Sequence, residues 1–426
     1  MVFDCFTFFN ELDLLEVRFM ELDAVVDKFV LVESNVTFAG VPKPLYFADS
    51  QSRFSDWCHK IVHVVVNDMP LGNDPWEREH HQRDAIIRGL RDATSADAAI
   101  ISDADEIPSA GAIRRWTPDQ GPRRFDQLFS YYWVNCVATG DWGFSKIVSM
   151  RDFSRSPDTT ALRGANYPSL GQGGWHFSFL GDDRRIVAKL EAWSHQETNR
   201  PPFKNPRYLR IVRASAIDLF ARPEMSWEFV PFDDRFPVSM IRNRERFDPF
   251  ICDAMFNDSL CSASDIFLLI TAYERTRGRK GANLEFGCRE GRSTVALANA
   301  CFPGPLIAVD TWCSNAGTRD VYEQFERNVK AVTSGNVHVT RTDPSDFLCQ
   351  WDAPIKFAHI GASRSQENVG LARQLIPKLV PGGILFGHNY STSEGIQDRE
   401  VGVERAVSEL LPGLESRGNC WLWRKR

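Results

Sequence analysis

Short apolar runs alternate with amphipathic helical patterns in two separate stretches of the chain, and this alternation most restricts the folds available to it. In the first stretch, residues 27–33 and 59–66 are short and rich in β-branched side chains, as buried strands are. A helical pattern follows at residues 76–92, and residues 98–101 form another apolar run. Strand, helix and strand in succession, with acidic residues at a strand's carboxyl end, predict an α/β domain whose ligands bind at the C-terminal edge of the sheet.

The second stretch shows the same alternation of strand and helix patterns after a poorly periodic segment at residues 236–263. Strands are expected at residues 283–287, 305–310, 355–360 and 383–386, and helices at residues 292–301 and 367–379. This pattern is typical of a doubly wound α/β domain. With 426 residues, the chain exceeds one ordinary domain of about 100–200 residues, and we place the domain boundary near Phe250, giving domains 1–250 and 251–426.

The composition excludes several classes of protein. Apolar residues make up 43% and charged residues 25% of the chain, which is the mixture of a globular protein with a sizeable core. The net charge is −6, and neither half has the basic excess of a nucleic-acid-binding surface. We therefore expect no nucleic-acid partner.

The cysteines and the apolar runs bear on the cellular compartment. The ten cysteines include no CxxC pair and no Cys/His cluster with zinc-finger spacing, so a reducing compartment is expected. No apolar stretch approaches the roughly 18–20 residues that span a bilayer, and residues 1–10 lack a basic signal-peptide start. The prediction is a cytoplasmic protein without a transmembrane segment.

Acidic residues follow directly on the strand at residues 98–101. Asp103 and Asp105 are two positions apart, so in an extended segment both carboxylates point to the same side. Their repulsion is relieved where a cation bridges them, and hard oxygen ligands suit Mg²⁺ or Mn²⁺ carrying a diphosphate. The alternative is a solvated loop before a helix that Ser109 caps.

Five separated motifs occur in order in the first domain: Phe9–Phe19 (FNELDLLEVRF), Val30–Asn35 (VLVESN), Gly40–Leu45 (GVPKPL), Asp103–Pro108 (DADEIP) and Gly174–His176 (GWH). Together they resemble glycosyltransferase family 17 over about residues 3–250. The resemblance implies a class A glycosyltransferase fold, Rossmann-like, with a DXD motif. It also implies a UDP-sugar donor, UDP-GlcNAc in the first instance, a divalent metal, a glycan acceptor and inversion at the anomeric carbon.

The resemblance also implies roles for single residues of the acidic motif. Asp105 would be a direct metal ligand, and Asp103 and Glu106 would contact the donor ribose or metal-bound water, with Asp103 near the metal. His176 could complete the metal sphere, or it could be a core or stacking residue beside Trp175.

Donor contacts and the general base are less well defined. Glu33 lies where such folds receive the nucleotide, or at an ordinary strand end. Arg83 and Asp84 could touch the diphosphate and the base, or form helix salt bridges. An inverting transfer needs one general base to deprotonate the acceptor hydroxyl. The candidates are Glu191, Glu197 and Asp141.

A glycine turn opens the second domain. Gly287 and Gly291 lie between a strand and a helix start, where backbone can approach a ligand closely, and Asp310 at the next strand end could accept from ribose hydroxyls. Ordinary packing turns are the alternative. With AVDTW at residues 308–312 and PGGILFGHNY at residues 381–390, the turn resembles class I S-adenosylmethionine-dependent methyltransferases over about residues 262–410.

That resemblance implies that S-adenosylmethionine is held by Glu285, Gly287, Gly291, Ser293 and Asp310, with Asp343 near its adenine. Gly361 and Asn389 replace two aspartates of the related pattern, so metal-dependent methyl transfer stays open beside a degenerate, cofactor-binding or structural domain.

Three functions remain open from the sequence. The first is a metal-dependent inverting glycosyltransferase whose appended domain O-methylates the glycan or is degenerate. The second is a non-catalytic carbohydrate- or nucleotide-binding scaffold. The third is a methyltransferase whose first domain recruits the substrate.

Overall fold

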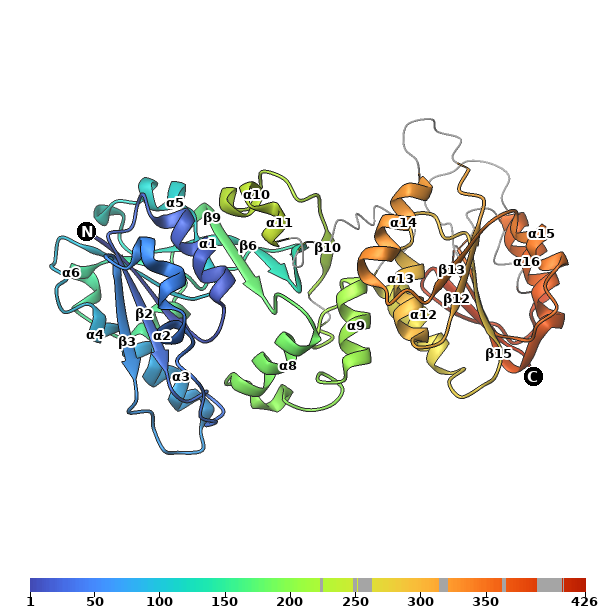
Figure 1. Ribbon diagram of the computed structural model, residues 1–426, viewed down its shortest axis with the longest axis horizontal. Helices are drawn as coiled ribbons and strands as arrows, with labels where there is room; N and C mark the ends of the chain where they lie inside the picture. The colour runs from blue at the N-terminus through green and yellow to red at the C-terminus, as the bar shows by residue number, and fades with distance from the viewer. Residues whose placement is uncertain are drawn as a thin grey trace. The chain divides into compact units, whose positions relative to one another are not determined.

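The computed structural model describes residues 1–222, 225–247, 251, 263–313, 321–361, 365–388, 408 and 410–426 (Figure 1). The chain divides into two compact units. The first comprises Met1–Asn205 and Val230–Ile251, and the second comprises Pro206–Phe229 and Cys252–Arg426. Residues 206–229, which the sequence placed in the first domain, therefore group with the second, where Arg207 pairs with Glu274 at 2.6 Å.

The first unit contains strands and helices in alternation. Its strands are β1 (Val2–Phe8), β2 (Lys28–Ser34), β3 (Ile61–Val66), β4 (Ala98–Asp103), β5 (Glu106–Pro108), β6 (Arg123–Tyr131), β7 (Trp133–Ala138), β8 (Lys146–Ser149) and β9 (Ser169–Ser178). Its helices are α1 (Leu12–Leu22), α2 (Tyr46–Asp49), η1 (Gln51–Trp57), α3 (Pro75–Asp84), α4 (Ile86–Gly89), α5 (Ala110–Arg115), η2 (Pro118–Gln120), α6 (Met150–Phe153), α7 (Thr159–Gly164), α8 (Asp183–Ala192), η3 (Gln196–Thr198), α10 (Val238–Arg242) and α11 (Arg244–Phe247).

The sheet of the first unit is mixed. Strands β3, β2, β1 and β4 are parallel neighbours in that order, which is the 3-2-1-4 order of a doubly wound fold. Beyond β4, strands β8, β6 and β7 continue the sheet in antiparallel pairs, and β9 pairs with both β6 and β5. The parallel half places the carboxyl ends of β1, β2 and β4 at one edge.

Apolar side chains fill both faces of this sheet. On one face, Phe19 of α1 is fully buried with Phe6 and Phe29 of the strands. On the other face, Ile86 of α4 and Leu162 of α7 join the valines of β2. Burial on both faces explains why these strands read as continuous apolar runs in the sequence.

The second unit repeats the α/β pattern. Its strands are β11 (Ala282–Phe286), β12 (Leu306–Asp310), β13 (Val337–Arg341), β14 (Ile355–Ile360), β15 (Leu379–Gly387), β16 (Glu415–Arg417) and β17 (Cys420–Arg424). Strand β10 (Trp227–Phe229) is instead the edge strand of the first sheet, next to β7. Its helices are α9 (Pro206–Ser215), α12 (Ala263–Glu274), α13 (Arg292–Cys301), α14 (Val321–Val332), α15 (Pro344–Cys349) and α16 (Ser365–Lys378).

The sheet of the second unit has the order β13-β12-β11-β14-β15-β17-β16. The first five strands are parallel in the 3-2-1-4-5 order of doubly wound folds, and β17 runs antiparallel to β15 and β16. Figure 1 shows α12 and α13 on one side of this sheet and α15 and α16 on the other. The doubly wound prediction is confirmed for this unit.

The strands and helices that the sequence predicts lie close to their expected ranges, although many further elements, among them β1 and β6–β9, were not predicted. The exception is the helix expected at residues 76–92, which breaks at Ala85 into α3 and α4 and ends at Gly89. Among the described residues, every helix is too short or too polar to cross a bilayer.

Candidate active site

A cavity of about 260 Å³ opens at the carboxyl ends of β1, β2 and β4 in the first unit. Thr7 and Phe8 close β1 on this edge, Val36 follows β2, and Asp103 closes β4. Ligands bind at this edge of open α/β sheets because the loops that follow the strands converge there. The further lining residues are Phe9, Glu11, Thr37, Phe38, Lys43, Trp76, Glu79, Gln82, Arg83, Ala104, Asp105, Glu106, Trp142, His176, Ser178, Lys189, Ala192, Trp193, Ser194 and His195.

The acidic motif forms a turn at the floor of this cavity, which corrects the extended segment expected from the sequence. Strand β4 ends at Asp103, Ala104 and Asp105 form the turn, and β5 begins at Glu106. The backbone N–H of Ala104 donates to the carbonyl of Thr7 at 3.1 Å, which bends the chain. All three carboxylates line the cavity, but each has different partners.

Arg18 of α1 holds the turn from below. Its guanidinium is fully buried and pairs with Asp4 at 2.6 Å. It also donates to the carbonyls of Asp103 at 3.0 Å and of Glu106 at 2.8 Å. The backbone of the acidic turn is therefore fixed by a buried charge that contacts peptide oxygens and leaves the motif's side chains to the cavity.

Arg163 of α7 neutralises the negative charges of two carboxylates of the motif. It pairs with Glu106 at 2.6 Å and with Asp103 at 2.9 Å, and Arg83 pairs with Asp103 at 3.2 Å. Burial alone would raise the pKa of Glu106, but Arg163 lowers it to about 2. Burial likewise opposes ionisation of Asp103, yet Arg163 and Arg83 lower its pKa. Both groups are carboxylates at neutral pH.

Asp105 faces a different pair of groups. Its Oδ2 accepts from Nζ of Lys189 at 2.7 Å and lies 3.7 Å from Nε2 of His176. Burial would raise the pKa of Asp105, but Lys189 and His176 lower it. The His176 ring stacks on Phe129 at 4.7 Å and contacts Trp142 at 4.3 Å, and its buried Nδ1 has no hydrogen-bond partner among the described residues.

These contacts allow a test of the predicted metal ligands. A carboxylate oxygen beside an imidazole nitrogen is a donor pair that a divalent ion such as Mn²⁺ accepts, so the chemistry of Asp105 and His176 is compatible with the predicted ion, while Lys189 donates to the same oxygen of Asp105. Asp103 is held by Arg83 and Arg163 instead. The three predicted ligands do not converge on one point in the described structure, because the turn separates Asp103 from Asp105.

Two predicted donor contacts lie outside the cavity lining. Glu33 is fully buried in β2, where it accepts from the backbone N–H of Phe47 at 3.0 Å and contacts His63 at 3.2 Å. Asp84 is exposed and accepts from Thr159 at 2.6 Å. Arg83, by contrast, lines the cavity as the sequence suggested, although its carboxylate partners also match the salt-bridge alternative.

The three candidates for the general base are also absent from the lining. Glu191 is exposed and pairs with Lys204 at 2.7 Å, and Glu197 is exposed and contacts His195 at 2.7 Å. Asp141 is exposed. The structure instead brings Glu11 into the cavity, where burial raises the pKa of its carboxyl group although Lys189 opposes this.

Sequence reasoning missed Arg163 and Lys189 for lack of a signal, since they lie 57 and 84 residues from their carboxylate partners. Glu11 did carry a signal, because it stands in the first quoted motif. Lys43, in the third motif, also lines the cavity.

The predicted cofactor residues of the second unit gather around the carboxyl ends of β11 and β12. Glu285 is fully buried, with Oε1 2.9 Å from Nδ1 of His359, and its Oε2 has no hydrogen-bond partner among the described residues. Asp310 accepts from the backbone N–H groups of Arg289 at 3.0 Å and Trp312 at 2.9 Å. An unsatisfied buried carboxylate oxygen suits a positively charged or N–H-bearing ligand group.

The glycines of the turn adopt the conformations that the sequence requires. Gly287 and Gly291 have φ of 75° and 96°, and Gly291 precedes α13 directly. Ser293 is buried in the first turn of α13, whereas Asp343 is exposed and caps α15 through its Oδ1. Gly361 follows β14, and Asn389 lies outside the described residues.

Comparison with known proteins finds a matching family model for each half of the chain. The sequence model of glycosyltransferase family 17 matches residues 1–228, and that of a methyltransferase domain matches residues 284–390. The β-1,4-mannosyl-glycoprotein 4-β-N-acetylglucosaminyltransferases of Homo sapiens and Rattus norvegicus are each 35% identical over 139 residues, or 29% of this chain. This chain aligns with 26% of the length of those curated relatives.

Solved structures are similar at lower identity. A putative O-methyltransferase from Klebsiella pneumoniae is 17% identical, covering 46% of this chain and 92% of its own, with a TM-score of 0.33. The Bacillus cereus O-methyltransferase in complex with SAH is 16% identical, covering 46% and 93%, with a TM-score of 0.32. Since the family match spans more than half of the sequence, the chain belongs to glycosyltransferase family 17 and carries a methyltransferase domain after it.

Proposed function

We propose that the first unit is a class A, inverting glycosyltransferase that moves a sugar, GlcNAc in the first instance, from a UDP-sugar to a glycan hydroxyl. The observation that carries this proposal is the cavity at the carboxyl ends of β1, β2 and β4, with an acidic turn at its floor. The 139-residue similarity to N-acetylglucosaminyltransferases supports the choice of donor.

The charges of the cavity suit a nucleotide diphosphate. Lys43, Arg83 and Lys189 line it, and each can contact phosphate oxygens. Asp105 and His176 would hold Mn²⁺ or Mg²⁺, which neutralises charge on the departing diphosphate when bound. Asp103 and Glu106 stay ionised beside Arg163 and keep the turn in place. In this arrangement Lys189 exchanges its contact with Asp105 for one with phosphate.

Glu11 is the proposed general base. It lines the cavity, and its Oε2 accepts from the backbone N–H groups of Phe9 at 3.1 Å and Asn10 at 3.0 Å, which fixes its orientation. Burial raises the pKa of Glu11, which makes its carboxylate a stronger proton acceptor at neutral pH. Glu191, Glu197 and Asp141 remain predictions that this cavity does not support.

Aromatic side chains supply the surface for a sugar. Trp76, Trp142 and Trp193 line the cavity, and Trp142 donates from Nε1 to Glu106 at 2.6 Å. Such rings stack on the apolar faces of sugars. The Trp142 ring is thereby oriented by the same carboxylate that Arg163 holds.

The test is release of UDP by the full chain from UDP-GlcNAc, UDP-Glc, UDP-Gal and UDP-GalNAc, with Mn²⁺ or Mg²⁺ and a mannose-containing acceptor. We expect metal-dependent release from one donor and a loss of at least about 100-fold in Asp105→Asn. Asp49→Asn, an exposed aspartate at the end of α2, is the matched control. Equal release by Asp105→Asn refutes the role of Asp105. Binding of UDP without any turnover favours the scaffold hypothesis.

For the second unit we propose binding of S-adenosylmethionine, with methyl transfer to an oxygen of the same glycan. The unsatisfied Oε2 of Glu285 and the strand-end carboxylate of Asp310 support a cofactor at this edge. Calorimetry with the cofactor tests binding, and transfer of a labelled methyl group tests activity. If the wild-type chain binds the cofactor, Asp310→Ala loses this binding and no methyl group reaches any glycan, the second unit only binds the cofactor.

A further inference from the structure

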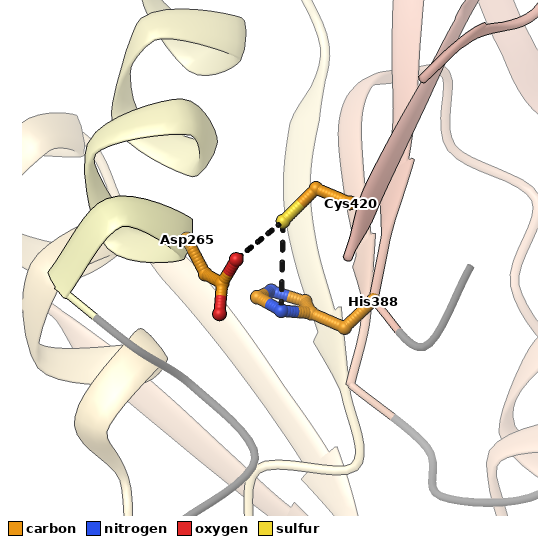
Figure 2. Close-up of side chains that lie close together, drawn as sticks. All are labelled: Asp265, His388 and Cys420. Carbon is orange, nitrogen blue, oxygen red and sulfur yellow. Dashed lines mark hydrogen bonds between the residues drawn. The ribbon is translucent and has the colours of Figure 1, made fainter. Parts of the chain in front are cut away.

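Three titratable side chains of the second unit, none of them a predicted cofactor residue, lie close together (Figure 2). Asp265 comes from the first turn of α12, His388 directly follows β15, and Cys420 begins β17. The sulfur of Cys420 lies 3.2 Å from Oδ1 of Asp265 and 3.9 Å from Nδ1 of His388. One potential ligand atom of each residue lies within 4.8 Å of the other two.

These distances match the edges of a tetrahedral metal site. With Zn–S of about 2.3 Å and Zn–N or Zn–O of about 2.0–2.1 Å, tetrahedral angles place neighbouring ligand atoms roughly 3.5 Å apart. The two measured contacts, 3.2 Å and 3.9 Å, lie on either side of that value.

Burial of these three polar side chains is unfavourable in free energy unless a ligand compensates for the lost water. The relative exposures of Asp265, His388 and Cys420 are 8%, 4% and 2%. The Nε2 of His388 has no hydrogen-bond partner among the described residues, and the same holds for Nε2 of His359, whose ring lies 4.9 Å away. A thiol, a carboxylate and an imidazole that are all buried and whose potential ligand atoms lie this close together are suited to a shared ligand, with Nδ1 as the nitrogen of His388 that contacts Cys420.

We propose that Asp265, His388 and Cys420 bind one zinc ion through a carboxylate oxygen, an imidazole nitrogen and a thiolate. Thiolate and imidazole favour zinc over magnesium. Three protein ligands leave a fourth position for water or a substrate oxygen. The site uses none of the positions of Gly361 and Asn389, where the related pattern has its aspartates, and it does not depend on the proposed glycosyltransferase function.

The site is tested with the untagged full chain, freed of metal by a chelator and titrated with Co²⁺ alone and then with Zn²⁺ alone. We expect one equivalent of Co²⁺ to give a thiolate-to-cobalt charge-transfer band, which Zn²⁺ abolishes and Mg²⁺ does not. Cys420→Ser should lose the band. Asp265→Asn and His388→Gln should weaken Zn²⁺ binding by at least about 100-fold, since even groups that only orient metal ligands contribute 10–100-fold.

Cys301→Ser is the matched control, because Cys301 is a buried thiol on α13 outside the cluster, and it should keep the band. Circular dichroism checks that each variant folds. If Cys420→Ser does not fold, Asp265→Asn is used for the test in its place. A band that persists in Cys420→Ser, or unchanged Zn²⁺ affinity in a folded Asp265→Asn, overturns the proposal. The absence of stoichiometric Co²⁺ binding overturns it as well.

Discussion

Replacement of Arg163 by methionine should destabilise the first unit more at neutral than at acidic pH. The guanidinium lies on the buried carboxylate of Glu106 at 2.6 Å and on Asp103 at 2.9 Å. Methionine keeps most of the length of the side chain but removes the charge, so Glu106 would remain buried without a cationic partner.

The magnitude follows from the ionisation of Glu106. Its pKa falls from an ordinary value of 4.5 to about 2 in the folded protein, which corresponds to ~3 kcal/mol of stability at pH 7. Because the folded-state pKa is the lower one, this contribution is complete above the unfolded-state value. It is lost as the pH falls toward the folded-state value, and ~2 kcal/mol remains at pH 3.5.

Hydrogen exchange of the amides in β4 measures this effect within the first unit, without treating the two-unit chain as one unfolding transition. At pH 7 we expect protection of these amides to fall by at least about 100-fold in Arg163→Met, with a smaller loss at pH 3.5.

Arg151→Met is the matched control, since Arg151 is 61% exposed and lies 3.8 Å from Asp152, and its effect should stay within ~0.5 kcal/mol. A loss of protection in Arg163→Met that is the same at both pH values would show that packing, and not the charge pair, holds the turn. That result would refute the electrostatic argument.

Three further substitutions test the proposed general base, the buried Arg18–Asp4 pair and the glycine turn of the second unit. Glu11→Gln should lower turnover by about 10²–10⁴-fold with the donor KM unchanged, measured by single-turnover and steady-state kinetics; unchanged turnover would exclude Glu11 as the base. Arg18→Met should cost ~3–5 kcal/mol because Asp4 stays buried and unpaired, again read from exchange in β4; a loss below ~1 kcal/mol would contradict this. Gly291→Ala should cost ~1–2 kcal/mol, since φ is 96° and the added Cβ would lie 3.0 Å from Phe325. A calorimetric transition of the second unit that does not move to lower temperature would count against that strain.

The sequence predicted the fold of both units closely, because local patterns determine it. The bounds of α13 and β14 match the expected ranges, since Gly291 begins the helix in a left-handed conformation and β14 is an uninterrupted buried run. The helix at residues 76–92 was predicted too long, because the Ile86 and Ile87 that suggested its continuation belong to the separate helix α4.

The candidate site was only partly predictable. The acidic motif was found because its residue types and spacing carry chemistry, and His176 because the GWH motif belongs to the family resemblance. The partners of those residues were not, since no spacing rule connects Asp105 to Lys189 across 84 residues or Glu106 to Arg163 across 57. The search for a base after the GWH motif gave carboxylates that turn out to be exposed, whereas burial distinguishes Glu11.

The contact of Arg18 with peptide oxygens affects how variants of this protein can be interpreted. Because the guanidinium binds the carbonyls of Asp103 and Glu106, exchanging the carboxyl groups of the motif leaves the anchor of the main chain intact. A defect in Asp105→Asn then reports a lost chemical group, not a displaced loop. The same anchoring makes the turn a suitable position for redesign, where new side chains could change the preferred nucleotide sugar while the peptide beneath them stays in place.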